Sequence, residues 1–381
     1  MSSPESEPHA PSGVSPSWGW ARGTPPQLRI VETEPLDYHR LLRGTSAYRW
    51  WKPLALLLLS GVFFGILTVV VTVAVIPVLL LTDPDYPAQV AAGTAAALDT
   101  QRPVSVLVSM VSIIIMLPAV LLAMLVLGMR PIGRIWSVAA RMRWGLLGRL
   151  FVISVLAIAV MNLVGIAAGV LLEPATDPAA AANETAFDAR AALLSMLLVL
   201  LLVPLQSTAE EVVFRGLFMQ VLGAWLRNPW FAILIPSIGF ASLHIYDIWG
   251  LLAVGLLGAV SAWLTWRTGG LEAAIAIHIV NNYVAFGIMA SGLTEETAQT
   301  TGDGSAAGLI GQIAGLGGIL VGAGLLVWLL LARPAPLLAF CASAPFPDRF
   351  QALFAALLLF ALPSVLMGAV SPFATRLAAR E

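Results

Sequence analysis

Long apolar segments dominate this 381-residue sequence and limit what it can fold into. A helix that crosses a bilayer needs about 20 mostly apolar residues. Hydrophobic residues make up 59% of the chain and charged residues only 11%, whereas a soluble domain carries roughly 25% charged residues. We therefore predict an all-α polytopic membrane helical bundle with eight or nine transmembrane helices. The candidate spans are residues 54–81, 104–128, 150–172, 191–226, 230–248, 250–266, 271–291, 308–332 and 351–371.

The charges between the spans predict an orientation. Residues 129–149 hold five arginines and no acidic residue, whereas the loops at 82–103 and 173–190 are mainly acidic. Basic loops remain on the cytoplasmic side, so we expect a cytoplasmic N-terminus. The segment at 191–226 is too long for one crossing, so part of it should tilt or run along the interface, and the count is eight or nine. The same alternation leaves Arg376 and Arg380 outside, which puts the last candidate span in doubt.

The chain divides into four predicted regions. Residues 1–45 are rich in Ser, Pro, Glu and Gly, a composition typical of disorder, and we expect them to form a disordered cytoplasmic tail. Residues 46–189 are expected to form N-terminal membrane helices, residues 190–292 the core that carries the chemistry, and residues 293–381 C-terminal membrane helices. Cys341 is the one cysteine in the sequence, so no intramolecular disulfide can form.

Some spans carry glycines four residues apart. Gly165 and Gly169 lie in one apolar segment, and Gly311 and Gly315 lie in another; Gly318 and Gly322 continue the pattern. Small residues at this spacing allow two helices to approach closely. We interpret them as helix-packing positions and assign them no chemistry.

Three ionisable residues interrupt the apolar segment at 191–226. They are Glu210, Glu211 and Arg215, and ionisable residues inside a membrane segment usually mark a functional site. Glu211 and Arg215 are four residues apart, so on a helix they share a face and can form an ion pair. Glu210 is rotated from Glu211 by about 100° and has no local cationic partner. An acid of this kind is a candidate general base.

Two histidines follow in apolar segments. His244 comes four residues after Phe240, and His278 comes four residues before Asn282; each pair would share a helix face. Two carboxylates, two imidazoles and an arginine inside a membrane protein are the groups that a water-activating hydrolase needs. A packing network of the same polar residues is the competing interpretation for the Glu-Glu-x-x-x-Arg string alone.

At these positions the sequence resembles the CPBP family, which comprises CAAX proteases, bacteriocin-processing enzymes and their bacterial Abi relatives. The family is marked by Glu-Glu-x-x-x-Arg, then Phe-x-x-x-His, then His-x-x-x-Asn. All three motifs occur in order here, at Glu210 to Arg215, Phe240 to His244 and His278 to Asn282. The resemblance covers roughly residues 190–292 and implies an intramembrane endopeptidase.

The resemblance also implies a role for each motif residue. Glu210 and His244 would hold and deprotonate the attacking water, and His278 and Asn282 would donate hydrogen bonds to the carbonyl oxygen as it gains charge. Support for these residues is expected from Glu211, Arg215 and Phe240.

The need for a metal stays open at this point. Glu210, His244 and His278 could be the three protein ligands of a catalytic Zn²⁺, as in a metalloprotease. However, the His-Glu-x-x-His motif is absent and the three residues lie on three separate segments. The sequence is therefore compatible with no cofactor or with Zn²⁺.

Two other functions use the same buried polar residues: a proton-coupled transporter, and a non-catalytic membrane scaffold or immunity protein. Other protease mechanisms have less support, because the sequence contains no Gly-x-Ser-x-Gly nucleophile elbow. The expected partners are the lipid bilayer and a membrane peptide or protein substrate, with no nucleic acid. Many arginines beside few lysines favour a bacterial host, hence the plasma membrane, and a bacterium would lack prenylated CAAX substrates.

Overall fold

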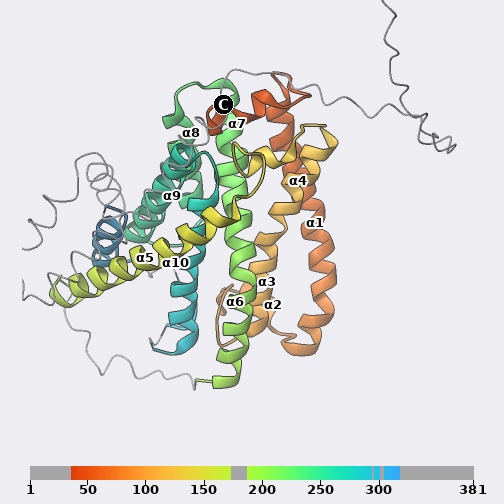
Figure 1. The fold of residues 1–381 in the computed structure, drawn as a ribbon. Helices are drawn as coiled ribbons and strands as arrows, with labels where there is room; N and C mark the ends of the chain where they lie inside the picture. The colour runs from red at the N-terminus through yellow and green to blue at the C-terminus, as the bar shows by residue number, and fades with distance from the viewer. Residues whose placement is uncertain (1–35, 173–186, 294–295, 301–303, 318–381) are drawn as a thin grey trace, which may run out of the picture. The chain divides into compact units, whose positions relative to one another are not determined.

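The protein is described by a computed structural model that covers residues 36–172, 187–293, 296–300 and 304–317. Apart from short turns and two isolated β-bridges, its regular secondary structure in these ranges is helical, which confirms the all-α prediction (Figure 1). The helices are η2 (Tyr38–Gly44), α1 (Lys52–Thr82), α2 (Tyr86–Ala91), α3 (Pro103–Ile114), α4 (Met116–Val126), η3 (Ile132–Ile135), α5 (Trp144–Leu172), α6 (Ala189–Glu211), η5 (Val212–Phe218), α7 (Met219–Trp225), α8 (Pro229–Ser242), α9 (Ile248–Thr268), α10 (Glu272–Ser291) and a helix at Ala306–Gly317.

Six helical segments in the described part of the chain are long and apolar enough to cross a membrane. The protein is therefore an integral membrane protein. One predicted span is shorter than expected, because α8 has 14 residues. The segment predicted at 308–332 is described only as far as Gly317. The span predicted at 351–371 lies outside the described residues. The six are Lys52–Thr82, Pro103–Val126, Trp144–Leu172, Ala189–Trp225, Ile248–Thr268 and Glu272–Ser291.

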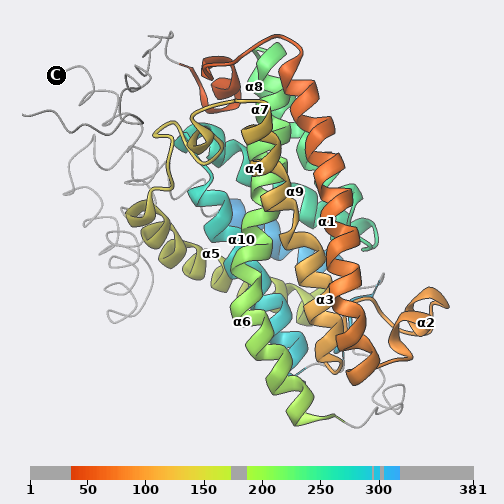
Figure 2. The same cartoon turned by 90° about the vertical axis from the view of Figure 1, so that its right-hand side faces the viewer.

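The continuous helical segment Ala189–Trp225 is the centre of the bundle. Its first part, α6, packs against α3 and α10, and α10 in turn packs against α5 and α9 (Figure 2). Leu193, Leu197 and Leu201 of α6 are exposed, as lipid-facing residues would be. The segment has 37 residues, or about 55 Å at 1.5 Å per residue, so it exceeds one hydrocarbon thickness, as its sequence length predicted.

The described part of the chain begins at residue 36, inside the range 1–45 that the sequence assigns to the N-terminal tail. Residues 38–44 form the 3₁₀ helix η2, which packs on α7. Tyr38 donates a hydrogen bond to the carbonyl of Ile135 (2.6 Å), and His39 Nε2 lies 3.1 Å from the carbonyl oxygen of Arg227. The contact depends on Tyr38 and Leu42, each at most 1% exposed. The mainly polar composition of residues 1–45 gave no indication of it.

The glycine spacing predicted close helix packing, and one pair confirms it. Gly165 of α5 and Gly311 of the helix at Ala306–Gly317 meet so closely that a Cβ on Gly311 would lie 2.8 Å from the Gly165 Cα and 2.6 Å from the Met161 carbonyl oxygen. The two backbones can approach so closely because Gly311 has no side chain, whereas a Cβ on Gly165 would make only ordinary contacts at 3.8 Å. Gly318 and Gly322 lie outside the described residues.

A buried ion pair fixes where α10 begins. Glu272 is fully buried in the first turn of α10 and accepts two hydrogen bonds from the Arg143 guanidinium, at 2.8 and 2.6 Å. Arg143 also donates to the carbonyl of Thr268 at the end of α9 (3.0 Å). Bidentate pairs of this kind set orientation as well as energy, so this contact sets the register of the helix that carries His278.

Candidate active site

The Glu-Glu pair lies where the central helix changes geometry. α6 ends at Glu211, and residues Val212–Phe218 form a π-helix before α7 continues. Turns of π-helix inside α-helices are rare and often occur at functional sites. The wider turn contains Arg215, whose Nη1 donates to Glu211 Oε1 at 2.9 Å with both side chains 1% exposed. The predicted ion pair between residues four apart is confirmed.

His278 joins the two glutamates. Its Nδ1 lies 2.7 Å from Glu211 Oε1 and its Nε2 lies 3.2 Å from Glu210 Oε2. Glu210 was predicted to have no local cationic partner, and the structure supplies a remote one from α10. An ionised carboxylate only accepts hydrogen bonds, so both ring nitrogens of His278 can donate together only when the ring is an imidazolium. In that state Glu210, Glu211, Arg215 and His278 carry no net charge.

The two carboxylates differ in burial and in partners. The Glu210 side chain is 12% exposed, whereas that of Glu211 is 1% exposed. Glu211 shares one oxygen between Arg215 and His278, and its other oxygen is buried with no hydrogen-bond partner among the described residues. Water can therefore reach Glu210 more easily than Glu211. The division into a reactive glutamate and a supporting one stays a prediction, for which this difference in access is relevant.

Phe240 connects the second histidine to the cluster. Its ring contacts His244 (centroids 4.7 Å apart) and His278 (5.8 Å), and the Arg215 guanidinium carbon lies 4.4 Å from its centroid. The two rings are thus neighbours as predicted, although α8 ends at Ser242 and His244 lies in the turn that follows the helix. A cation over an aromatic ring is a favourable contact, so Phe240 stabilises the Arg215 guanidinium as well as packing against the two histidines.

His244 itself makes no hydrogen bond or ion pair with Glu210 or Glu211 in the part of the chain that the structure describes. Its Nδ1 lies 2.8 Å from the carbonyl oxygen of Phe240. A carbonyl oxygen accepts, so Nδ1 carries a proton and Nε2 is the lone-pair nitrogen of the neutral ring. His244 is therefore oriented, half-buried and able to accept a proton at Nε2.

Asn282 belongs to a chain of amides that runs between two helices. Its Nδ2 donates to Gln206 Oε1 of α6 at 3.1 Å, and Asn281 Nδ2 donates to Asn282 Oδ1 at 3.2 Å. These contacts leave one N–H of Asn282 for another acceptor. Asn282 is one helical turn beyond His278, so both can address one oxygen atom.

Gln206 is a site residue that the sequence analysis missed. It is 4% exposed and lies one turn before Glu210 on α6. The i, i+4 spacing that singled out Arg215 also links Gln206 to Glu210, so this signal was present in the sequence. An uncharged amide in an apolar segment is simply less conspicuous than a carboxylate.

The arrangement does not fit the possible zinc site. Zinc needs three protein ligands around one point, and the described residues contain no group of three His, Cys, Asp or Glu side chains that could hold a metal. Both nitrogens of His278 already face carboxylates, and His244 is linked to the cluster only through Phe240. The described geometry therefore does not bring Glu210, His244 and His278 together around one point, and their conditional role as metal ligands stays a prediction.

Comparison with known proteins identifies the same region. Residues 190–284 match the family described as "Type II CAAX prenyl endopeptidase Rce1-like". A curated relative, "Uncharacterized protein YyaK" of Bacillus subtilis (strain 168), is 34% identical over 90 residues, which are 22% of this chain and 30% of the relative. The match thus spans less than a third of that relative's length, and no solved structure matches the chain. The resemblance predicted from the three motifs is confirmed for residues 190–284, which carry the sequence signature of this family of CAAX-type endopeptidases.

Proposed function

We propose that this protein is an intramembrane endopeptidase that hydrolyses a peptide bond of a membrane-associated peptide or protein. One observation carries the proposal: Glu210, the most accessible acid of the cluster, faces a histidine whose far side is anchored by the buried pair of Glu211 and Arg215. Such an arrangement holds a carboxylate and an imidazole in fixed orientation inside an apolar bundle. The family match over residues 190–284 supports the same reaction class.

In the proposed reaction, Glu210 and His244 hold a water molecule and Glu210 takes one of its protons as the oxygen attacks the carbonyl carbon. His278 exchanges its contact with Glu210, the longer of its two, for the carbonyl oxygen that becomes negative. Asn282 donates its remaining N–H to the same oxygen. Glu210 then donates this proton to the leaving nitrogen as the C–N bond breaks.

The substrate class and the location are part of the proposal. We place the protein in a bacterial plasma membrane with a cytoplasmic N-terminus, because the basic loop at 129–149 is expected on the cytoplasmic side. The match to a Bacillus subtilis protein supports a bacterial setting. A bacterium would lack prenylated CAAX proteins, so a leader-bearing peptide or the tail of a membrane protein is the proposed substrate.

The test compares the wild type with Glu210→Gln, which keeps the shape of the side chain and removes the base. Both full-length proteins are reconstituted with a bacterial membrane-protein extract, and new termini are identified by mass spectrometry. Asp85→Asn is the control for loss of a carboxylate, because Asp85 is exposed and far from Glu210 in the sequence. We expect new termini with the wild type and the control, and none with Glu210→Gln at an unchanged melting temperature.

Two results would contradict the proposal and favour the alternatives. The protein would be a transporter if the wild type gave no new termini but carried a flux of protons or solutes that Glu210→Gln abolishes. Unchanged biological activity of a correctly folded Glu210→Gln protein would indicate a non-catalytic scaffold or immunity protein.

A further inference from the structure

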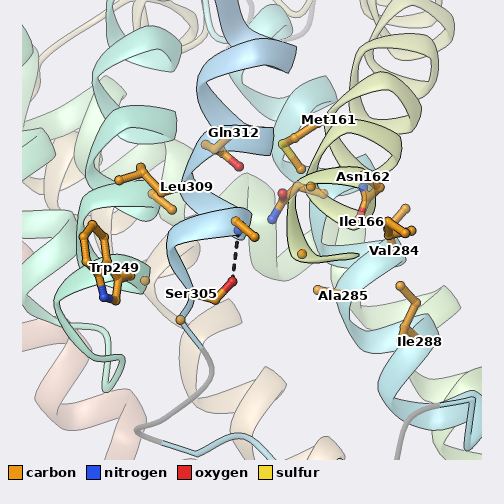
Figure 3. Close-up of a pocket in the computed structure, with 18 residues that line it drawn as sticks. Met161, Asn162, Ile166, Trp249, Val284, Ala285, Ile288, Ser305, Leu309 and Gln312 are labelled. Atoms are coloured by element: carbon orange, nitrogen blue, oxygen red, sulfur yellow. Dashed lines mark hydrogen bonds between the residues drawn. The ribbon is translucent and has the colours of Figure 1, made fainter. Parts of the chain in front are cut away.

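A cavity lies beside the chain of amides that includes Asn281 and Asn282, and it plays no part in the proposed chemistry. It measures about 490 Å³, within the range of small-molecule and peptide pockets. Its walls come from four helices (Figure 3): Met161 and Ile166 of α5, Trp249 of α9, Val284 and Ile288 of α10, and Leu309 and Gln312 of the helix at Ala306–Gly317.

The lining of this cavity is apolar with uncharged amide groups. Asn162, Asn281 and Gln312 are lining residues, and none of the described residues that line the cavity carries a charge. Gln312 is 7% exposed, so its amide is almost fully withdrawn from the surface. A buried amide needs a hydrogen-bond partner, because leaving it unpaired costs free energy. A ligand with both donors and acceptors would satisfy it.

The cavity is connected to the candidate active site by adjacent residues. Asn281 lines the cavity, and its Nδ2 donates to Oδ1 of Asn282, the residue proposed to bind the carbonyl oxygen. Ala285, one turn further along α10, also lines the cavity and is exposed. A chain that leaves the carbonyl held by Asn282 can therefore continue along this face of α10.

We propose that the cavity binds the uncharged, extended segment of the substrate next to the bond that is cut. This inference rests on the proposed function and deepens it by naming what the substrate must contain: a few consecutive small or apolar residues without charge. A charged residue in this segment would be excluded, because the cavity offers no group that could pair with it.

The amides favour a peptide over a lipid chain as the occupant. Every residue of an extended peptide brings one N–H and one C=O that require partners, and the side chains of Gln312 and Asn281 can provide them. An acyl chain brings neither, so it would fill the apolar part of the cavity and leave the buried amide of Gln312 unpaired. Gly308 in the lining, where a Cβ would meet nothing nearer than the Ser305 hydroxyl at 3.5 Å, also leaves room for a second backbone.

The test measures binding without cleavage. Full-length Glu210→Gln protein in vesicles of phosphatidylethanolamine and phosphatidylglycerol is irradiated with an acetylated, amidated alanine peptide that carries one photo-leucine. We expect labelling at residues 161–166 or 284–288. In this background Ala285→Trp, which fills the cavity, should abolish the labelling, whereas Ala74→Trp on the exposed face of α1 should not. Gln312→Leu should weaken labelling about threefold to tenfold, the effect of one lost hydrogen bond.

Each alternative result has a distinct meaning. Labelling of the same residues by a diazirine phosphatidylcholine that excess peptide does not displace would overturn the proposal in favour of a lipid site. Peptide labelling that Ala285→Trp leaves unchanged would overturn it as well. Specific peptide labelling together with a wild type that cleaves nothing would support the binding site and refute the peptidase function instead.

Discussion

His278 Nδ1 and Glu211 Oε1 form a 2.7 Å hydrogen bond between residues 67 positions apart in the chain. This contact connects α10 to the end of α6 at the point where the π-helix begins. The same Glu211 oxygen also accepts from Arg215, so one buried acceptor determines the positions of a cation and an imidazole. The geometry of the candidate site therefore depends on a residue that need not touch the substrate.

Glu211→Gln should destabilise the protein much more than Glu210→Gln. The substitution leaves the buried Arg215 without its carboxylate, and removal of one partner of a buried ion pair typically costs about 3–5 kcal/mol. Glu210 is more exposed and has no contact with Arg215, so its substitution should change the melting temperature little. Thermal unfolding in detergent measures both variants side by side. Equal melting temperatures would contradict the supporting role of Glu211.

Gln206→Leu should slow turnover without unfolding the protein. Asn282 loses the acceptor that orients its amide, and one misaligned hydrogen bond to the developing oxyanion corresponds to about a tenfold loss of rate. We expect the loss in kcat and little change in KM, since Gln206 orients a group that acts in the transition state. Ser207→Ala is the matched control, because the Ser207 hydroxyl also contacts Gln206 Oε1 but does not contact Asn282. If both variants lose activity equally, Gln206 has no specific positioning role.

Gly311→Ala should be costly and Gly308→Ala should be tolerated, although both lie on the helix at Ala306–Gly317. A Cβ at Gly311 would meet the Met161 carbonyl oxygen at 2.6 Å, whereas at Gly308 the nearest neighbour is the Ser305 hydroxyl at 3.5 Å. Overpacking of this kind costs about 1–3 kcal/mol. The melting temperatures of the two variants distinguish a steric clash at Gly311 from a general effect of alanine in this helix. Similar values would refute the Gly165–Gly311 contact.

Acidification should loosen η2 from α7. Burial lowers the pKa of His39 below its usual value of 6.5; its contact with the Arg227 carbonyl and the charge of Asp37 oppose this shift, and Arg40 adds to it. The unfolded segment therefore takes up a proton at a higher pH than the folded one, so stability is constant above about pH 6.5 and falls as the pH drops toward the lowered pKa.

Hydrogen exchange of residues 38–44 measures this effect at pH 7.5 and pH 5.5. The wild type should exchange faster at the lower pH once the intrinsic rates are corrected, and His39→Gln should show no such difference. An equal pH response of the two proteins would show that another group is responsible.

Cleavage should persist in 1,10-phenanthroline. The described donors do not converge on one point in the way that zinc requires, and the proposed water is held by Glu210 and His244. The same reconstituted assay with and without the chelator provides the measurement. Activity lost in the chelator and restored by added Zn²⁺ would show that the bound form of the site differs from the geometry described above.

The local pairs of the candidate site could be predicted from the sequence because they depend on spacing alone. Glu211 and Arg215, and also His278 and Asn282, are four residues apart along a helix, and a helix places such residues on one face whatever surrounds it. Apolar length likewise predicts helices that can cross a membrane. The short length of helix α8 and the helix η2 were not predicted, because they depend on packing against α7 and α9 and not on local composition.

Contacts between distant segments were decided by the tertiary structure alone. Nothing in the spacing of Glu210 and His278 shows that they meet, and the sequence therefore left Glu210 without a partner. The π-helix, the Gln206–Asn282 hydrogen bond and the Arg143–Glu272 pair have the same origin. The physical reason is that burial forces each polar group to find a partner, and which partner it finds depends on how the helices pack together.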